Sequence, residues 1–147
     1  MITLRNFTEN DILQLRKNKY HKLSTEEIRK LICDWNSKMY EEKYFEMFAI
    51  IRGKEIVGTI SLYEQSKSVV SCGIEIFEAY RGKGYSQEAL SYGLEISKRK
   101  GYKIATSQIR VDNFASIALH KKLAFELSHE YVNRKGNSVY FYMKPLV

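Results

Sequence analysis

The feature that most constrains this chain is a short segment, Arg81-Gly82-Lys83-Gly84-Tyr85-Ser86, that separates two different periodic patterns. The residues from Val69 to Phe77 alternate like a strand, and apolar residues from Gly84 to Lys100 recur at helical spacing. Glycines let a ligand approach the backbone, and a helix start presents unpaired N–H groups that attract anions. The segment therefore predicts an anion site, to which Arg81 and Lys83 add full charges.

Spacing excludes two common kinds of phosphate-binding loop. A Walker loop requires a hydroxyl residue directly after its lysine, whereas Lys83 is followed by Gly84 and the hydroxyl comes at Ser86. A dinucleotide-binding loop requires a third small residue where this chain has Gln87. An ordinary strand-to-helix turn with solvated basic residues stays open at this point.

The other patterns predict a mixed α/β fold. Thr8-x-x-Asp11 and Ser24-x-x-Glu27 each form a capping box, which indicates two helix starts. With no linker or repeat in 147 residues, we expect one domain over residues 1–147, with a mixed sheet flanked by helices on both faces. The expected strands are Ile2 to Phe7, Tyr44 to Ile51, Glu55 to Tyr63, Val69 to Phe77, Lys103 to Val111, Glu126 to Val132 and Val139 to Met143, with a short helix from Asn113 to Leu123.

Charge and cysteine content narrow the function classes. The net charge of +7 favours an anionic partner, but the chain has no nucleic-acid-reading motif, and no apolar run approaches the roughly 18 residues of a membrane span. Cys33 and Cys72 stand far apart without a metal-ligand spacing. We therefore expect a soluble, cytoplasmic protein with reduced cysteines, no metal site, and neither nucleic acid nor membrane as a partner.

The glycine segment resembles motif A of the GCN5-related N-acetyltransferase (GNAT) family, Gln/Arg-x-x-Gly-x-Gly/Ala, with Arg81, Gly84 and Ser86 at its three marked positions. Ser86 departs from the usual Gly or Ala. Downstream, Asn113 to Phe125 resembles the family's Asn-x-x-Ser and Lys-x-Gly-Phe block, with Ala124 where Gly is usual. Two motifs at compatible spacing, together with the predicted element order, extend the resemblance over nearly the whole chain.

The resemblance implies an acetyl-coenzyme A site. In the family, the strand before motif A and the strand after the next helix part, and the pantetheine arm enters between them. The implied cofactor-binding residues are the Ile76 amide, which would polarise the acetyl carbonyl, and the motif positions Arg81, Gly82, Lys83, Gly84, Tyr85, Ser86, Asn113 and Ser116. The assembly stays open, with a homodimer as one alternative.

Catalytic residues are harder to transfer from the family. Many members have a tyrosine as the general acid where this chain has His120. The ordinary pKa of histidine, near 6.5, suits a proton donor. A partly exposed structural histidine is the alternative. Some relatives carry a glutamate base where this chain has Gln108, so Glu75 is our candidate base, with Glu64 as a weaker one and a solvated Glu75 as the alternative.

The implied reaction is direct transfer of an acetyl group from acetyl-coenzyme A to a primary amine, on a peptide N-terminus or a small molecule. The resemblance implies that residues Ser24 to Phe48 and the closing hairpin determine acceptor specificity, and the aromatic residues of the first segment form either a pocket or plain core. These aromatic residues are Trp35, Tyr40, Tyr44, Phe45 and Phe48. An acyl-coenzyme-A-binding regulatory module without catalysis is the competing function.

Overall fold

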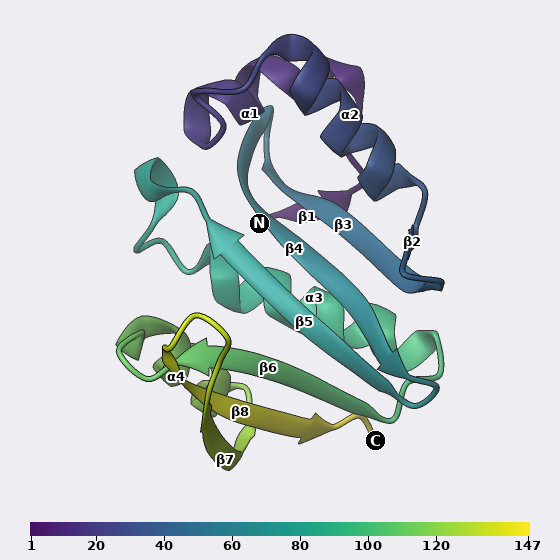
Figure 1. Cartoon of the computed structure of the whole chain (residues 1–147). Helices are drawn as coiled ribbons and strands as arrows, with labels where there is room; N and C mark the ends of the chain where they lie inside the picture. Colours follow the sequence, from purple (N-terminus) through teal and green to yellow (C-terminus); the bar gives the residue numbers. More distant parts are fainter.

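The computed structural model describes residues 1–147 and arranges eight strands in one mixed sheet (Figure 1). The strand order is β1-β3-β4-β5-β6-β8-β7, and the short β2 pairs with β3 beside this path. All neighbours are antiparallel except β5 and β6. The predicted fold class is therefore confirmed.

The elements lie within a few residues of their predicted ranges. The strands are β1 (Thr3–Arg5), β2 (Met39–Tyr40), β3 (Lys43–Arg52), β4 (Glu55–Ser66), β5 (Val69–Ile76), β6 (Ile104–Arg110), β7 (Glu126–Val132) and β8 (Ser138–Pro145). The helices are α1 (Ile12–Asn18), α2 (Thr25–Asn36), α3 (Tyr85–Arg99) and α4 (Phe114–Lys122), with 3-10 turns η1 (Glu9–Asp11) and η2 (Glu78–Tyr80). No helix is both long and apolar enough to cross a bilayer.

Helices α1 and α2 cover one face of the sheet at its β3 and β4 strands (Figure 1). One capping box forms at the start of η1, which leads into α1, where the Thr8 amide donates to Asp11 Oδ2 at 2.8 Å; the other forms at the start of α2, where the Glu27 amide donates to Ser24 Oγ at 3.1 Å. The buried side chains of this layer form a cluster of nine residues that includes Phe7, Ile12, Ile28 and Ile32. The sequence signals for the helix starts therefore correspond to actual contacts.

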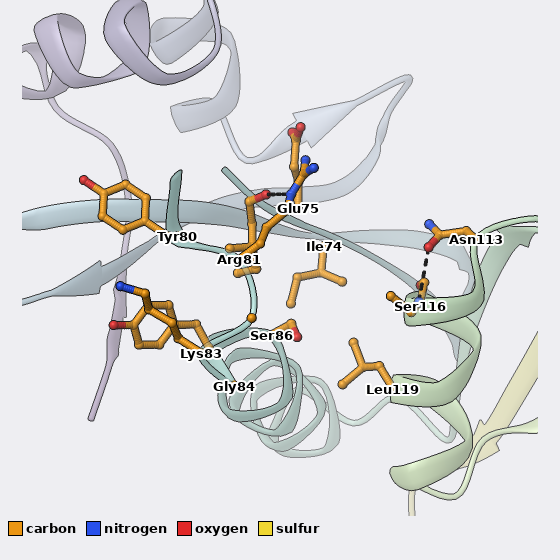
Figure 2. Close-up of a pocket in the computed structure, with 14 residues that line it drawn as sticks. Ile74, Glu75, Tyr80, Arg81, Lys83, Gly84, Ser86, Asn113, Ser116 and Leu119 are labelled. Carbon is orange, nitrogen blue, oxygen red and sulfur yellow. Dashed lines mark hydrogen bonds between the residues drawn. The ribbon is translucent and has the colours of Figure 1, made fainter. Parts of the chain in front are cut away.

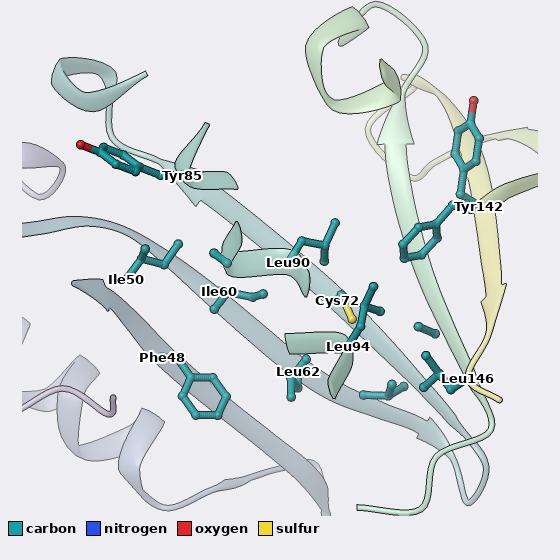
Figure 3. Packing of buried hydrophobic residues seen from close by; sticks show 14 of the residues in the cluster. Phe48, Ile50, Ile60, Leu62, Cys72, Tyr85, Leu90, Leu94, Tyr142 and Leu146 are labelled. Carbon is teal, nitrogen blue, oxygen red and sulfur yellow. The ribbon is translucent and has the colours of Figure 1, made fainter. Parts of the chain in front are cut away.

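The opposite face carries α3 and the larger of the two cores, a cluster of 18 buried residues (Figure 3). Leu90 and Leu94 of α3 pack there with Ile60, Leu62 and Cys72 of the sheet. Gly93 lets α3 lie close to the sheet, because a Cβ atom at this position would sit 2.7 Å from Ile60 Cδ1. This close contact between helix and sheet fixes the position of the α3 N-terminus relative to β5.

The hairpin between α2 and β3 was not predicted. Met39 and Tyr40 pair with Tyr44 and Lys43, and the turn between them places Glu41 and Glu42 at φ values of 51° and 67°. Glycine or asparagine normally occupies such left-handed positions, so two glutamates gave no turn signal.

Candidate functional site

Strands β5 and β6 are parallel neighbours that pair over only three residues and then part. Val69, Val70 and Ser71 match Ile104, Ala105 and Thr106, and no pairing follows. Beyond this point the Ser107 hydroxyl donates to the Cys72 carbonyl at 3.2 Å, which bridges the start of the gap. The parting that the family resemblance implied is therefore present.

The Ile76 amide points into this gap. The next amide, that of Phe77, donates to the Val57 carbonyl of β4 at 2.9 Å. Successive amides of a strand point to opposite edges, so the Ile76 N–H faces the β6 side. There it is directed to the space that a ligand between the strands would occupy.

Two glycines shape the turn that leads from β5 to α3. Gly82 and Gly84 have φ values of 78° and 80°, which a residue with a side chain rarely adopts. A Cβ atom at either position would meet open space. The backbone conformation is therefore what requires glycine, and the same open space leaves the loop accessible to a ligand, as the sequence predicted.

The N-terminus of α3 is built for an anion. Gly84 is its N-cap residue and supplies no capping side chain, so the first N–H groups of this 15-residue helix lack a side-chain partner. The single acid of the first turn, Glu88, is held elsewhere because its Oε2 accepts from the Ile2 amide at 3.0 Å. Phosphate oxygens fit these free donors.

Arg81 and Lys83 carry the two positive charges of the loop. Arg81 Nε donates to the Ile76 carbonyl at 2.9 Å, so this side chain braces the end of β5 as well as charging the loop (Figure 2). Lys83 contacts no carboxylate within ion-pair distance. Its ammonium is therefore available to an incoming anion.

These features line one cleft of about 580 Å³ between η2, the start of α3 and α4 (Figure 2). All nine predicted cofactor-binding residues lie in its wall. The lining comprises Ile74, Glu75, Ile76, Tyr80, Arg81, Gly82, Lys83, Gly84, Tyr85, Ser86, Asn113, Ala115, Ser116 and Leu119. Tyr85 is largely buried, and its hydroxyl accepts from Arg52 at 2.5 Å, so it offers the cleft its backbone and ring.

Asn113 and Ser116 form the far wall of the cleft and also start α4. The Asn113 side-chain oxygen accepts from the Ser116 amide at 3.2 Å, which caps the helix (Figure 2). The Asn-x-x-Ser motif therefore has a structural role before any ligand binds.

His120 lies behind the cleft and does not line it. The residue is 2% exposed; its Nδ1 lies 2.8 Å from the Ser116 carbonyl and its Nε2 lies 2.9 Å from Ser107 Oγ. Burial lowers the pKa of His120, and the bond to Ser116 offsets part of this effect. The expected partial exposure is thus wrong, whereas the two hydrogen bonds fit a structural histidine; donation of a proton by His120 requires a buried imidazolium.

Glu75 lines the cleft, but on the other face of the sheet from His120. Its side chain alternates with those of Ile74 and Ile76, and it forms an ion pair with Lys19 at the end of α1. Across the gap, Gln108 accepts a hydrogen bond from the Tyr131 hydroxyl. The two candidate catalytic residues therefore approach the gap from opposite sides.

The predicted acceptor aromatics do not reach this cleft. Phe48 is part of the large core, Trp35 packs against Phe7 with ring centroids 5.1 Å apart, and Tyr44 stacks on Tyr102 at 6.2 Å. Tyr40 and Phe45 contact each other and Tyr63 near the β2 hairpin. None of the five lines the cleft; the core interpretation fits Phe48, Tyr44 and Trp35, whereas Tyr40 is 55% exposed.

Sequence reasoning missed Gly58 of β4. A Cβ atom there would lie 2.2 Å from the Glu75 carbonyl oxygen, so only glycine lets β4 approach β5 beside Ile76. Glycine within an otherwise regular strand pattern was the available signal. Lys19 was missed as well, because an ion pair between residues 56 positions apart leaves no local pattern.

Most of the chain matches one family model. Residues 2–126 match the family model described as an acetyltransferase (GNAT) domain. This chain belongs to the GNAT family. The match begins directly before β1 and ends at the start of β7, so it includes the cleft and the two motifs beside it.

Relatives and solved structures agree with this assignment. The SPbeta prophage-derived N-acetyltransferase YokL of Bacillus subtilis, itself uncharacterised, is 28% identical over 95 residues, which are 63% of this chain and 54% of YokL. This chain therefore spans about half the length of that relative.

Two solved structures share the fold. The ribosomal-protein α-amino acetyltransferase RimL, in complex with coenzyme A, has a TM-score of 0.82 at 20% identity, covering 98% of this chain and 93% of its own. A chimera of the Vibrio cholerae spermidine N-acetyltransferase SpeG and hSSAT has a TM-score of 0.80 at 17% identity, covering 99% and 95%. At such identities the likeness establishes the fold.

Proposed function

We propose that this chain is an N-acetyltransferase that moves the acetyl group of acetyl-coenzyme A directly to a primary amine. The observation that carries the proposal is the gap between β5 and β6, which opens beside a glycine turn and an uncapped helix start. An extended chain with phosphates at one end fits this combination, because the strand edge offers backbone donors along its length and the helix start offers N–H groups at its end.

The residues present suit that cosubstrate. The backbone N–H groups from Gly82 to Ser86 and the charges of Arg81 and Lys83 would hold the pyrophosphate. Asn113 and Ser116 would bound the opposite side of the cleft, where both already lie. Acetyl-coenzyme A supplies the activated acetyl thioester, and the RimL structure with coenzyme A supports this choice of ligand class.

The chemistry requires an oxyanion donor, a base and an acid. The Ile76 N–H, which points into the gap, is our proposed donor to the carbonyl oxygen. Glu75, on the side away from α3, is our proposed base for the incoming amine, and His120, near the start of the gap, is our proposed acid for the departing thiolate. The opposite positions of Glu75 and His120 fit an attack from one face and departure on the other.

The acceptor class is a primary amine on a peptide or protein N-terminus or on a small molecule. An α-amino group near pKa 7.8 is neutral about once in seven molecules at pH 7, whereas a lysine amine is neutral about once in 2,500. Glu75 is the only carboxylate in the cleft wall, and Lys19 already pairs with it. We therefore favour an α-amino acceptor, as RimL's name describes for that protein.

We further propose that residues 1–147 act as one domain in the cytoplasm. The continuous sheet from β1 to β7 supports the first point. A homodimer is compatible with the exposed edge strand β7, in which Leu127 and Val132 are solvent-exposed.

Release of free coenzyme A thiol is the test of the activity. Acetyl-coenzyme A is mixed with the protein and a panel of amines, including N-terminal-serine peptides, peptides with a blocked N-terminus and a single lysine, and spermidine. We expect amine-dependent thiol release that is fastest with the free N-terminal peptides. Tight binding of acetyl-coenzyme A without amine-dependent release from any acceptor would instead favour the regulatory binding module.

A further inference from the structure

The ion pair between Lys19 and Glu75 brings an amine of this chain to the edge of the proposed acetyl site. Lys19 follows the last residue of α1, and its Nζ contacts Glu75 Oε1 although the two residues lie 56 positions apart in sequence. Glu75 belongs to the cleft wall and directly precedes Ile76. One end of a lysine side chain therefore touches the carboxylate that we assign as the base.

No other lysine of the chain is placed in this way. Two further lysine–carboxylate pairs exist, Lys30 with Asp34 and Lys38 with Glu46, and neither carboxylate lines the cleft. Lys83 lines the cleft but pairs with no carboxylate. Lys19 is thus the one lysine whose amine pairs with a carboxylate in the cleft wall.

The pair is also partly exposed to solvent. The two side chains are 37% and 38% exposed, so solvent screens their attraction and the pair adds little to stability. Lys19 has left the helical conformation, with φ −146° and ψ −50°, and stands at the start of the segment that joins α1 to α2. The Lys19 side chain can therefore leave Glu75 and adopt another rotamer while α1 stays folded.

The geometry points to Lys19 as an acetyl acceptor within this chain, a self-acetylation site. This inference rests on the proposed function. The Glu75 carboxylate takes one proton from the Lys19 ammonium and passes it to solvent. The neutral Nζ then attacks the thioester carbonyl, the N–C bond forms and the C–S bond breaks. The second proton lost from nitrogen goes to the thiolate, which leaves coenzyme A as a free thiol and Lys19 as a neutral amide.

Acetylation would change the acceptor side of the cleft. A neutral acetyl-lysine cannot pair with Glu75, so the carboxylate becomes available to an external amine. The modification thus removes a cation that competes with the acceptor at this position, and we expect acetylated protein to have a lower KM for external amines than unmodified protein.

The test is incubation of the whole protein with acetyl-coenzyme A at pH 8.5, without added amine, followed by peptide mapping by mass spectrometry. A basic pH raises the neutral fraction of any lysine amine. We expect acetyl groups to accumulate at Lys19 at least about tenfold faster than at Lys17 or Lys83, and Glu75→Gln to slow the Lys19 reaction about tenfold or more. Thermal melting of Glu75→Gln confirms that the variant is folded, and Lys17→Arg serves as the matched variant, which should leave the Lys19 rate unchanged.

Two results overturn the inference and are distinct from failure of the function. Thiol release with external amines while Lys19 stays unmodified would leave the proposed activity intact and remove Lys19 as an acceptor. Equal acetylation of Lys17, Lys19 and Lys83, unaffected by Glu75→Gln, would show an uncatalysed surface reaction. Failure of the proposed function itself appears separately, as binding of acetyl-coenzyme A without amine-dependent thiol release from any acceptor of the panel, or as no binding at all.

Discussion

The two faces of the sheet differ in how they are built. The face that carries α3 and α4 has the 18-residue core, the glycine turn and the capped start of α4. The face that carries α1 and α2 has a nine-residue core, and it reaches the cleft through the partly exposed ion pair between Lys19 and Glu75 and through Tyr80, which packs against that core.

We infer from this difference that one face binds the cosubstrate and the other binds the amine. The face with the larger core supplies backbone groups, which recognise a ligand common to the family without needing particular side chains. The other face supplies side chains on exposed segments, where substitutions cost little stability and change specificity. We expect perturbations of the first face to alter cosubstrate binding and perturbations of the second to alter the response to the amine.

The largest effect is expected at the glycine turn. Gly84→Asp places a carboxylate against the phosphate site and forces a side chain into a backbone with φ of 80°. Like charges in contact cost several kcal/mol, so we expect coenzyme A affinity to fall about 100-fold or more in isothermal titration. Gly136→Asp is the matched control, because Gly136 has a φ of 81° and lies outside the cleft. Equal affinities for the two variants would break the assignment of the loop.

A pair of core truncations compares the two faces directly. Leu90 of α3 and Ile28 of α2 are both fully buried, so Leu90→Ala and Ile28→Ala should each lower the free energy of unfolding by about 2–5 kcal/mol. Leu90→Ala loosens the helix whose start forms the phosphate site and should weaken coenzyme A binding. Ile28→Ala should keep that affinity and raise the KM for the amine. The reverse pattern in titration and steady-state kinetics would contradict the division of roles.

His120 predicts a pH dependence of stability. Its pKa is lowered in the folded protein because the ring is buried, so the unfolded chain binds a proton more readily. The corresponding stability is complete above the unfolded pKa of about 6.5 and is lost as the pH falls below it. Urea unfolding from pH 7.5 to 5 should show a steeper loss for the wild type than for His120→Phe.

His120→Phe should also retain coenzyme A binding and lower the turnover rate, because it removes the proposed proton donor. A turnover rate equal to that of the wild type would remove the acid role.

The smallest effect is expected at Ala124. Its φ is 66°, and the amides of Ala124 and Phe125 donate to the carbonyls of Lys121 and His120, which closes α4 with a Schellman motif. Glycine is the residue that fits this position without strain, so Ala124→Gly should raise the free energy of unfolding by about 0.5–1 kcal/mol. Chemical denaturation measures the change, and a loss of stability would show that α4 ends differently.

Local signals explain what the sequence could predict. The two capping boxes, the alternating strands and the glycine turn each depend on neighbours a few residues apart, and each appears in the structure close to its predicted place. The contact of Lys19 with Glu75 joins distant segments and leaves no such pattern, and the glycine inside the β4 strand pattern did not show that Gly58 lies against Glu75. The burial of His120 was missed for the same reason, since Ser107 of β6 and Tyr142 of β8 lie against it.

The central claim is that acetyl-coenzyme A binds in the gap between β5 and β6 with its phosphates on the glycine turn. Backbone amide resonances, recorded by 15N–1H NMR during titration with acetyl-coenzyme A, test this most directly. We expect large shifts at Ile76, Gly82, Gly84 and Ser86, with Gly53 and Gly136 unchanged as internal references. Saturable binding with shifts confined to residues outside the cleft would contradict the claim.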